Sequence, residues 1–358
     1  MNLREEVLIE VEKFAFLRDV AEQPEVLVRV FTEYSGTLFS RPDFAASRIR
    51  TAPLTVAFGM GSSYYAAELF ALYLNAQGMP VFALDAGELL HYRKALLSNC
   101  IALVGVSQSG ESIETCLVAE NRPTEATLVS VTNVENSRLA RVGDVVLPLL
   151  AGKESGTSSK TFIATVAVLY ALASAVLLDN RFSLDHLKSC VDIMRGIVDG
   201  GVEEARVLAS SFEGSSIIYV GRGPGLVSAL QSALITKEIA CVHAEGMSAG
   251  QFRHGPIELV GPETLIVIFA PSGSTIDLLI KLAKEVAEYG SPTWLVTDES
   301  VDVPRELNLF VTRFPVVEES LSPLISIVAS EFFAAYLGER KGRIPGELVR
   351  AKKVTMHE

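Results

Sequence analysis

The fold is decided by the stretch LTVAFGMGSS, residues 54–63, in which a short apolar run ends in a turn of glycine and serine. Apolar runs of this length are typical of strands buried on both faces. A helix is expected from about residue 64 to residue 76. Further strands are expected at residues 81–84, 100–106, 127–132 and 144–148, with a long apolar helix at about 161–178. Strands that alternate with helices predict a parallel sheet covered on both faces.

The same pattern returns about 162 residues later. Gly59 corresponds to Gly221, and Ala86–Gly87 corresponds to Ala249–Gly250. The strands of this second copy are expected at residues 216–220, 264–270, 293–297 and 309–312. A steady offset between several elements indicates that one α/β domain occurs twice.

The expected division of the chain has four parts. They are N-terminal helices at 1–50, a first domain at 51–195, a second domain at 196–340 and a C-terminal tail at 341–358 that lies over the active site. A helix near residues 183–210 is expected to join the two domains. A second helix start is expected at residues 22–25, because Pro24 suits the first turn of a helix.

Composition narrows the possible partners. Of the 358 residues, 49% are hydrophobic and 21% are charged, as in a well-packed globular protein. The net charge of −12 opposes binding to nucleic acid and to anionic lipid, so neither is expected as a partner. An anionic ligand must therefore be held by local groups, because the overall field repels it.

Cysteine and histidine usage points to a reducing compartment and away from metal. Each of the four cysteines lies in an apolar stretch, so buried free thiols are expected at Cys100, Cys116, Cys190 and Cys241. The five histidines show no metal-ligand spacing, and no cofactor is expected. The charged N-terminus lacks the apolar core of a signal peptide, and no membrane span is expected, so the predicted location is the cytoplasm.

Two loops of the first copy are candidates for phosphate binding. In open parallel sheets, ligands bind beyond the carboxyl ends of the strands, and backbone N–H groups at helix starts attract anions there. The candidates are Gly61, Ser62 and Ser63 in one loop, Ser107, Gln108, Ser109 and Ser112 in the other, and Ser158 in a third loop at 153–161. One such loop alone is usually a turn with a helix cap. Two at neighbouring strands favour an anion site.

A dinucleotide-binding fold is the alternative for the first loop. Its fingerprint needs a third glycine where this chain has Tyr64. The acidic residue that it needs after the second strand has only Asp85 as a candidate. The sequence therefore disfavours a dehydrogenase.

The second copy carries the candidate reactive groups. Glu238 lies in an otherwise apolar helix, where a carboxylate tends to have a raised pKa and suits acid–base work. A surface pair of Lys237 and Glu238 is the plainer interpretation of that segment. His254 precedes Gly255-Pro256, so an exposed turn is expected around a group that titrates near neutral pH. Nothing local marks Lys352 in the tail as a nucleophile.

Together these segments resemble the SIS (sugar isomerase) family along nearly the whole chain. The resemblance is closest to the isomerase half of glucosamine-6-phosphate synthase, and it implies two tandem SIS domains, each a flavodoxin-like three-layer sandwich. The matching segments are GSSY (61–64), SQSGES (107–112), SSKT (158–161), KEI (237–239), HAE (243–245), RHGP (253–256) and AKKVT (351–355). The HAE and HGP segments and the Ala-Lys tail point to the branch that acts on C1 and C2 of hexose phosphates.

The resemblance implies a role for each site residue. Glu238 would carry a proton between C1 and C2, and Lys352 would form a Schiff base with the ketose carbonyl. His254 would assist ring opening and would come from the neighbouring subunit, so a homodimer is expected. The phosphate and the sugar hydroxyls would be bound by Gly61, Ser62, Ser63, Ser107, Gln108, Ser109, Ser112, Ser158 and Ala351. Such chemistry needs neither a metal nor a redox cofactor.

The chain departs from the resemblance at two points. The synthase has a glutaminase domain with a cysteine after the initiator methionine, whereas this chain has Asn2, so transfer of ammonia from glutamine is not expected. The family has an active-site lysine where this chain has Ile235, on the helix face of Glu238. Lys237 points about 100° away and should not replace it. An altered reaction is therefore expected.

The leading hypothesis is a phosphosugar isomerase/deaminase that converts glucosamine 6-phosphate to fructose 6-phosphate and ammonia. A deglycase of fructosamine 6-phosphate and a ketose/aldose phosphate isomerase are close variants. A sensor that binds a sugar phosphate without turnover is the hypothesis from another class. The presence of Glu238, His254 and Lys352 together argues against the sensor, because binding alone needs none of them.

Overall fold

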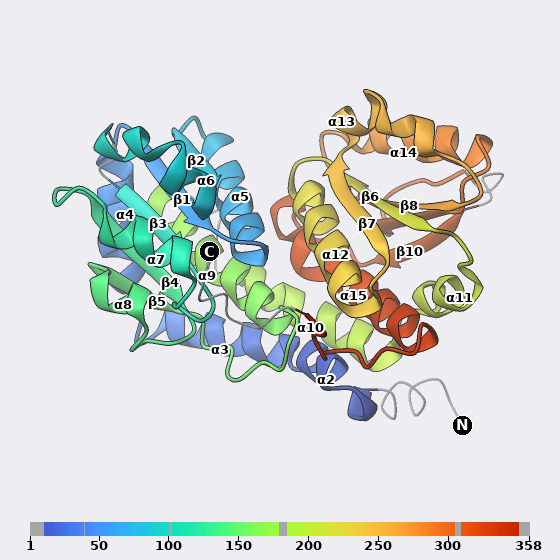
Figure 1. Ribbon diagram of the computed structural model, residues 1–358, viewed down its shortest axis with the longest axis horizontal. Helices are drawn as coiled ribbons and strands as arrows, with labels where there is room; N and C mark the ends of the chain where they lie inside the picture. The colour runs from blue at the N-terminus through green and yellow to red at the C-terminus, as the bar shows by residue number, and fades with distance from the viewer. Residues whose placement is uncertain (1–10, 39, 100–101, 179–184, 305–308, 351–358) are drawn as a thin grey trace. The chain divides into compact units, whose positions relative to one another are not determined.

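The computed structural model describes residues 11–38, 40–99, 102–178, 185–304 and 309–350, and it contains two copies of one architecture (Figure 1). The chain divides into two compact units. One is built mainly from Gln23–Glu154 and Ser158–Lys188, and the other mainly from Ser189–Leu348. Each unit holds a five-stranded sheet in which all neighbouring strands are parallel.

The first sheet has the strand order β2-β1-β3-β4-β5. Its strands are β1 (Thr55–Gly59), β2 (Val81–Asp85), β3 (Ala102–Val106), β4 (Thr127–Thr132) and β5 (Val145–Pro148). Every residue of β1 and of β3 is buried, which explains why these strands are continuous apolar runs in the sequence.

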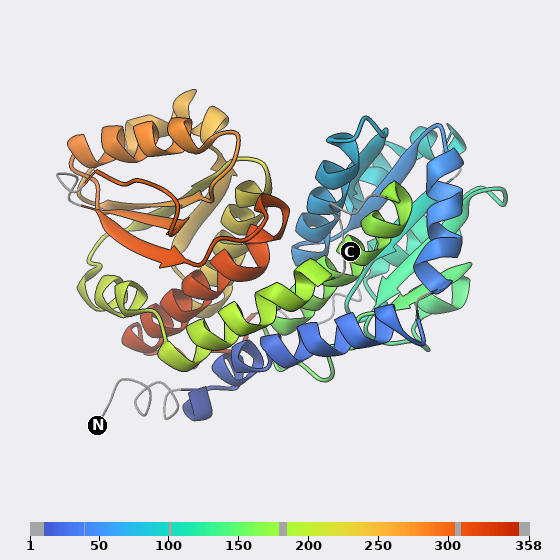
Figure 2. The ribbon, with the colours of Figure 1, turned by 180° about the vertical axis from the view of Figure 1, so that it is seen from behind.

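Helices cover both faces of the first sheet. One face packs its apolar core against α6 (Ala86–His91), α7 (Ile113–Glu120) and α8 (Arg138–Val142). On the other face α9 (Lys160–Leu177) contacts α3 (Gln23–Ser35), α4 (Ser40–Thr51) and α5 (Ser62–Asn75). Figure 2 shows α3 running alongside α9. The short η1 (Lys94–Asn99) precedes β3. The result is a three-layer sandwich.

The second sheet repeats this plan, with the order β7-β6-β8-β9-β10. Its strands are β6 (Ser216–Gly221), β7 (His243–Ser248), β8 (Thr264–Ala270), β9 (Thr293–Asp298) and β10 (Phe310–Phe314). One face packs on α13 (Ala249–Arg253) and α14 (Ile276–Glu288). The other helices of this unit are α2 (Ala15–Ala21), α11 (Glu203–Ser211), α12 (Pro224–Ala240), η3 (Pro256–Leu259), η4 (Glu319–Leu321) and α15 (Ser322–Arg340). Helix α10 (Asp185–Gly200) begins in the first unit and lies mostly in the second. The duplicated α/β fold predicted from the sequence is therefore confirmed.

Two features differ from the prediction. Strand β7 at the sheet edge was not expected, because its sequence HAEGMS contains no apolar run and only Ala244 among its residues is buried. The single helix expected near 183–210 is two helices, α10 and α11. Gly201 between them has φ of +67°, which an α-helix does not accommodate.

Long apolar helices occur in the core of both units. Helix α9 and the segment Glu319–Arg340 are long and apolar enough to cross a membrane by length and composition alone. Within the protein, 83% and 100% of these segments are buried, as in the core helices of a globular domain. Their apolar character is thus explained by packing.

The cysteine prediction is correct at two positions and wrong at one. Cys116 and Cys190 are free and buried, as expected. Cys241 is free but exposed, because it caps the end of α12 with φ of +53°. Cys100 lies outside the described residues.

Candidate active site

The two serine-rich loops of the first copy lie at the ends of neighbouring strands. Phe58 of β1 is paired with Gly105 of β3, so both loops leave the same edge of the sheet. A Cβ atom on Gly59 would lie 2.8 Å from the carbonyl oxygen of Val106 and 2.9 Å from Cβ of Ser63. Glycine at this position therefore allows the start of α5 to approach the end of β3.

The first loop presents an open helix start. Gly61 has φ of +52° and ψ of −126°, a conformation that favours glycine, and it provides no side-chain cap for α5. Ser62 and Ser63 are half-buried, and their hydroxyls make no hydrogen bond within the described part of the chain. First-turn N–H groups and free hydroxyls together suit an anion.

The second loop is held in shape by its own serines. The Oγ atoms of Ser107 and Ser109 accept hydrogen bonds from the N–H groups of Gly110 and Glu111, at 3.1 and 3.2 Å. The side chains of Gln108 and Ser112 are half-buried and make no hydrogen bond among the described residues. Ser107 and Ser109 thus fix the turn and keep a hydroxyl proton to donate, while Gln108 and Ser112 are available to a ligand.

The third loop is folded around a buried carboxylate that sequence reasoning missed. Glu154, 5% exposed, accepts hydrogen bonds from the N–H groups of Ser159 and Thr161, both at 2.9 Å, and from Oγ1 of Thr161 at 2.6 Å. The Oγ of Ser158 lies 3.1 Å from Oγ1 of Thr161. The helix start of α9 is therefore capped by a side chain. At the start of α5 no side chain caps the helix, and the N–H of Ser63 donates to the carbonyl of Met60. The sequence signal that could have indicated this cap is Glu154 itself, an acidic residue just before a cluster of serine and threonine residues.

A phenol–carboxylate pair follows the first loop and was also missed. The hydroxyl of Tyr64 donates to Oε1 of Glu68 at 2.5 Å, one helical turn further along α5. Burial, followed by this hydrogen bond to Glu68 and the charges of Glu68 and Asp85, raises the pKa of Tyr64. The phenol therefore stays protonated near neutral pH, and its one proton is committed to the carboxylate of Glu68.

Glu238 occupies a half-buried position near the end of α12. Ile235, one turn earlier, is fully buried, whereas Lys237 is exposed. Lys237 and Ile235 therefore lie on different faces of α12, as expected, and Lys237 does not take the place of the missing lysine. The hydroxyl of neighbouring Thr236 contacts that of Tyr219 on β6 at 2.7 Å, which fixes this part of the helix against the sheet.

His254 lies in an exposed turn, as its sequence context predicted. It caps the end of α13, and Gly255 continues with φ of +129° into Pro256. Arg253 forms an ion pair with Glu285 of α14, with Nη1 and Oε2 2.6 Å apart. This ion pair anchors the turn to the unit while the imidazole stays accessible.

The remaining candidates divide by their place in the chain. The two serine-rich loops belong to the first unit, and Glu238 and His254 belong to the second. Lys352 and Ala351 lie outside the described residues. Among the described residues there is no group of three His, Cys, Asp or Glu side chains that could hold a metal ion.

These features define the class of protein, a duplicated α/β fold whose candidate ligand loops lie at the carboxyl edge of an open parallel sheet. The model of the SIS domain family matches the chain twice, at residues 49–175 and 212–337. The protein belongs to this family.

Relatives of this chain include sugar-phosphate enzymes. Glutamine--fructose-6-phosphate aminotransferase (isomerizing) of Zymomonas mobilis is 26% identical over 341 residues, which cover 91% of this chain and 56% of the relative. The chain spans about half the length of the curated relatives that it matches.

The solved structures that share the fold include two proteins of amino-sugar metabolism by name. The C-terminal domain of glucosamine-fructose-6-phosphate aminotransferase from Francisella tularensis has a TM-score of 0.81 at 21% identity, covering 93% of this chain and 98% of that one. Glucosamine-6-phosphate deaminase from Thermotoga maritima has a TM-score of 0.75 at 20% identity, covering 95% and 99%. At this level of identity, the likeness establishes the architecture of the chain.

Proposed function

We propose that this protein is a phosphosugar isomerase/deaminase that acts at C1 and C2 of glucosamine 6-phosphate and releases fructose 6-phosphate and ammonia. The observation that supports it most is the pair of open serine-rich loops at β1 and β3, whose free hydroxyls suit a phosphate without any lysine. Membership of the SIS family and the structural likeness to a glucosamine-6-phosphate deaminase agree with it.

The reaction balances as two proton transfers and one hydrolysis. Once the sugar ring is open, the carboxylate of Glu238 takes the proton from C2 and returns it to C1, while a proton of the substrate ammonium moves to O1, so the C1 aldehyde becomes a hydroxymethyl group and the C2 ammonium becomes an iminium. Lys352 then attacks C2 and expels ammonia, and water cleaves the resulting Schiff base to give the C2 ketone. Overall, glucosamine 6-phosphate and water yield fructose 6-phosphate and ammonium.

The two open loops of the first copy each have a task in this reaction. The helix start at Ser62 and Ser63 faces the phosphate, and Gln108 and Ser112 donate or accept hydrogen bonds with the phosphate or the sugar hydroxyls. The Tyr64 hydroxyl, whose proton is donated to Glu68, leaves its oxygen as an acceptor next to the first loop. The net charge of −12 makes such local groups necessary for an anionic substrate.

We further propose a homodimer in which His254 acts in the site of the neighbouring subunit. The imidazole lies on an exposed turn held by the Arg253–Glu285 ion pair, so it is positioned outward from its own unit. The buried free thiols of Cys116 and Cys190 support the cytoplasm as the location.

The apolar residue at position 235 favours reactions that expel an amine. A lysine next to Glu238 would repel the protonated amine of the substrate, and Ile235 removes that repulsion. A deglycase of fructosamine 6-phosphate shares this feature with the deaminase and is the second candidate. A ketose/aldose isomerase has no amine to accommodate and gains nothing from the change.

The experiment compares substrates in one assay. Purified protein is incubated with glucosamine 6-phosphate, with fructosamine 6-phosphate and with fructose 6-phosphate, and ammonium, free amine and sugar phosphates are quantified together. Equal amounts of ammonium and fructose 6-phosphate from the first substrate support the deaminase. Turnover of fructosamine 6-phosphate alone assigns the deglycase. Binding of these compounds without turnover contradicts both and supports a sensor.

A further inference from the structure

The second copy has its own version of the serine-rich loop. SQSGES (107–112) follows β3, and PSGST (271–275) follows the corresponding strand β8. The neighbouring strands agree as well in their register. Val106 pairs with Val131 in the first sheet, and Phe269 pairs with Val296 in the second, so Thr132 and Thr297 follow equivalent residues. Asn133 and Asp298 directly follow these threonines and therefore correspond to each other.

Asp298 fills one end of the second loop. Its Oδ2 accepts the N–H of Ser272 at 2.5 Å, and its Oδ1 accepts the N–H and the hydroxyl of Ser300 at 3.0 and 2.5 Å. Burial opposes ionisation, but these hydrogen bonds from Ser300 and Ser272 together lower the pKa of Asp298. A permanent negative charge thus occupies the loop amide that a bound anion would use.

Glu319 fills the other end. Burial raises the pKa of its carboxyl, and the N–H of Ser274 nearby opposes that rise. A Cβ atom on Gly273 would lie 2.2 Å from the carboxyl carbon of Glu319, so the carboxylate lies directly against the loop backbone. It also approaches Gly223, where a Cβ atom would lie 3.9 Å from Oε1.

Gly223 starts its helix in the same way as Gly61 in the first copy. The backbone angles are φ of +51° and ψ of −129° at Gly223, and φ of +52° and ψ of −126° at Gly61. The carboxylate of Glu319 therefore lies where two glycine loops of the second sheet converge. In the first copy, this is the position proposed for the phosphate.

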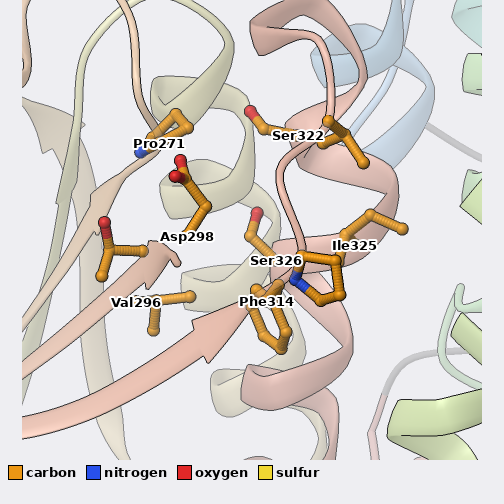
Figure 3. A pocket seen from close by; sticks show the side chains of 10 residues that line it. Pro271, Val296, Asp298, Phe314, Ser322, Ile325 and Ser326 are labelled. Atoms are coloured by element: carbon orange, nitrogen blue, oxygen red, sulfur yellow. The ribbon is translucent and has the colours of Figure 1, made fainter. Parts of the chain in front are cut away.

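The pocket next to this loop contains a polar atom without a partner (Figure 3). Ser322 is 5% exposed, and its Oγ makes no hydrogen bond among the described residues. Figure 3 shows this hydroxyl pointing across the pocket toward Pro271 and Asp298. The pocket thus offers a donor that the internal carboxylates leave unused.

The first copy has no carboxylate at either position. Asn133 there bonds to the backbone of Ala151 and Gly152. Thr157 corresponds to Glu319, because each stands three residues before the long helix of its copy, α9 or α15. We propose that the second copy retains an anion-binding loop and that the carboxylates of Asp298 and Glu319 occupy it. Each wild-type chain therefore binds one phosphate-bearing ligand, in the first copy. Removal of the two carboxylates opens a second site. Ligand binding by the first copy rests on the proposed function, whereas the occupied loop of the second copy does not.

The test restores the first-copy residues in the second copy with the double variant Asp298→Asn/Glu319→Thr. Titration calorimetry with inorganic phosphate and with fructose 6-phosphate counts the sites per chain. The wild type is expected to bind one equivalent and the double variant two, with phosphate binding by the second copy at least tenfold tighter than in the wild type. Glu318→Ala, an exposed neighbour, is the matched control and should keep one site.

The outcomes separate this inference from the proposed function. One site in a double variant with an intact thermal melt overturns the inference, and so do two sites in the wild type. If the double variant does not fold, the single variant Glu319→Thr decides by the same count. No site in the wild type but one in the variant refutes phosphate binding by the first copy and leaves the second-copy inference standing.

Discussion

Replacing Gly59 by alanine tests how the fold builds the first-copy loops. The added Cβ atom would lie 2.8 Å from the carbonyl oxygen of Val106, whereas ordinary contact begins at 3.4 Å, so the backbone must move by 3.4 − 2.8, about 0.6 Å. The second close atom, Cβ of Ser63 at 2.9 Å, belongs to the proposed phosphate loop. The displacement therefore falls on the start of α5.

Two magnitudes follow from this displacement. Overpacking in a closely packed site costs about 1–3 kcal/mol of unfolding free energy. A misplacement of a binding group that approaches 1 Å lowers catalysis by up to about 100-fold, so kcat/KM of Gly59→Ala should fall by roughly 10- to 100-fold. Most of the loss should appear as an increase in KM for the phosphosugar.

The assay is steady-state kinetics with a thermal melt of the same samples. Gly196→Ala is the matched control, because no atom lies within 4 Å of its Cβ position in α10. Alanine there should stabilise the protein by about 0.5–1 kcal/mol and leave KM unchanged. Unchanged KM in Gly59→Ala would refute the placement of Ser62 and Ser63 in the phosphate site.

Three further predictions concern residues away from that contact. Glu154→Ala leaves two helix-start N–H groups unsatisfied, so the free energy of unfolding should fall by about 3 kcal/mol and Tm by about 6–12 °C. Glu154→Gln should lose about half as much stability. Equal melting of the wild type and both variants would contradict the role of the carboxylate. At pH 8, iodoacetamide should modify exposed Cys241 and spare Cys116 and Cys190, because burial raises the pKa of these two thiols to about 11 and about 12. Peptide mapping measures the rate at each cysteine. Modification of either buried thiol as fast as Cys241 would refute the prediction. Ile235→Lys should reduce kcat/KM for glucosamine 6-phosphate at least tenfold, because the lysine would repel the amine of the substrate. Ile235→Met is the control for side-chain size. Full activity of the lysine variant would show that position 235 does not influence the reaction.

Elements with buried apolar runs were predictable from the sequence. Strands β4 and β8 have the expected bounds because all or nearly all of their residues are buried, so the chain there is rich in apolar and β-branched residues. Strand β7 was not predictable, because an edge strand with exposed His243 and Glu245 carries no such run. The break at Gly201 was missed because helical periodicity continues on both sides of it.

The candidate site was predictable only where the signal is local. Glycine and serine after a strand identified both loops of the first copy. The side chains that occupy the second-copy loop come from residues 298 and 319, far along the chain from Ser272 and Ser274. Such a contact depends on tertiary packing, so no local pattern could indicate it.

In the proposed reaction, Glu238 moves a proton between C1 and C2 of a hexose phosphate. Its most direct test is proton NMR of glucosamine 6-phosphate labelled with deuterium at C2, incubated with the wild type and with Glu238→Gln. We expect the wild type to break the C2–D bond as fructose 6-phosphate appears, and Glu238→Gln to leave the label in place with an unchanged melt. A label that stays at C2 during wild-type turnover, or is lost equally fast in both proteins, would contradict the account.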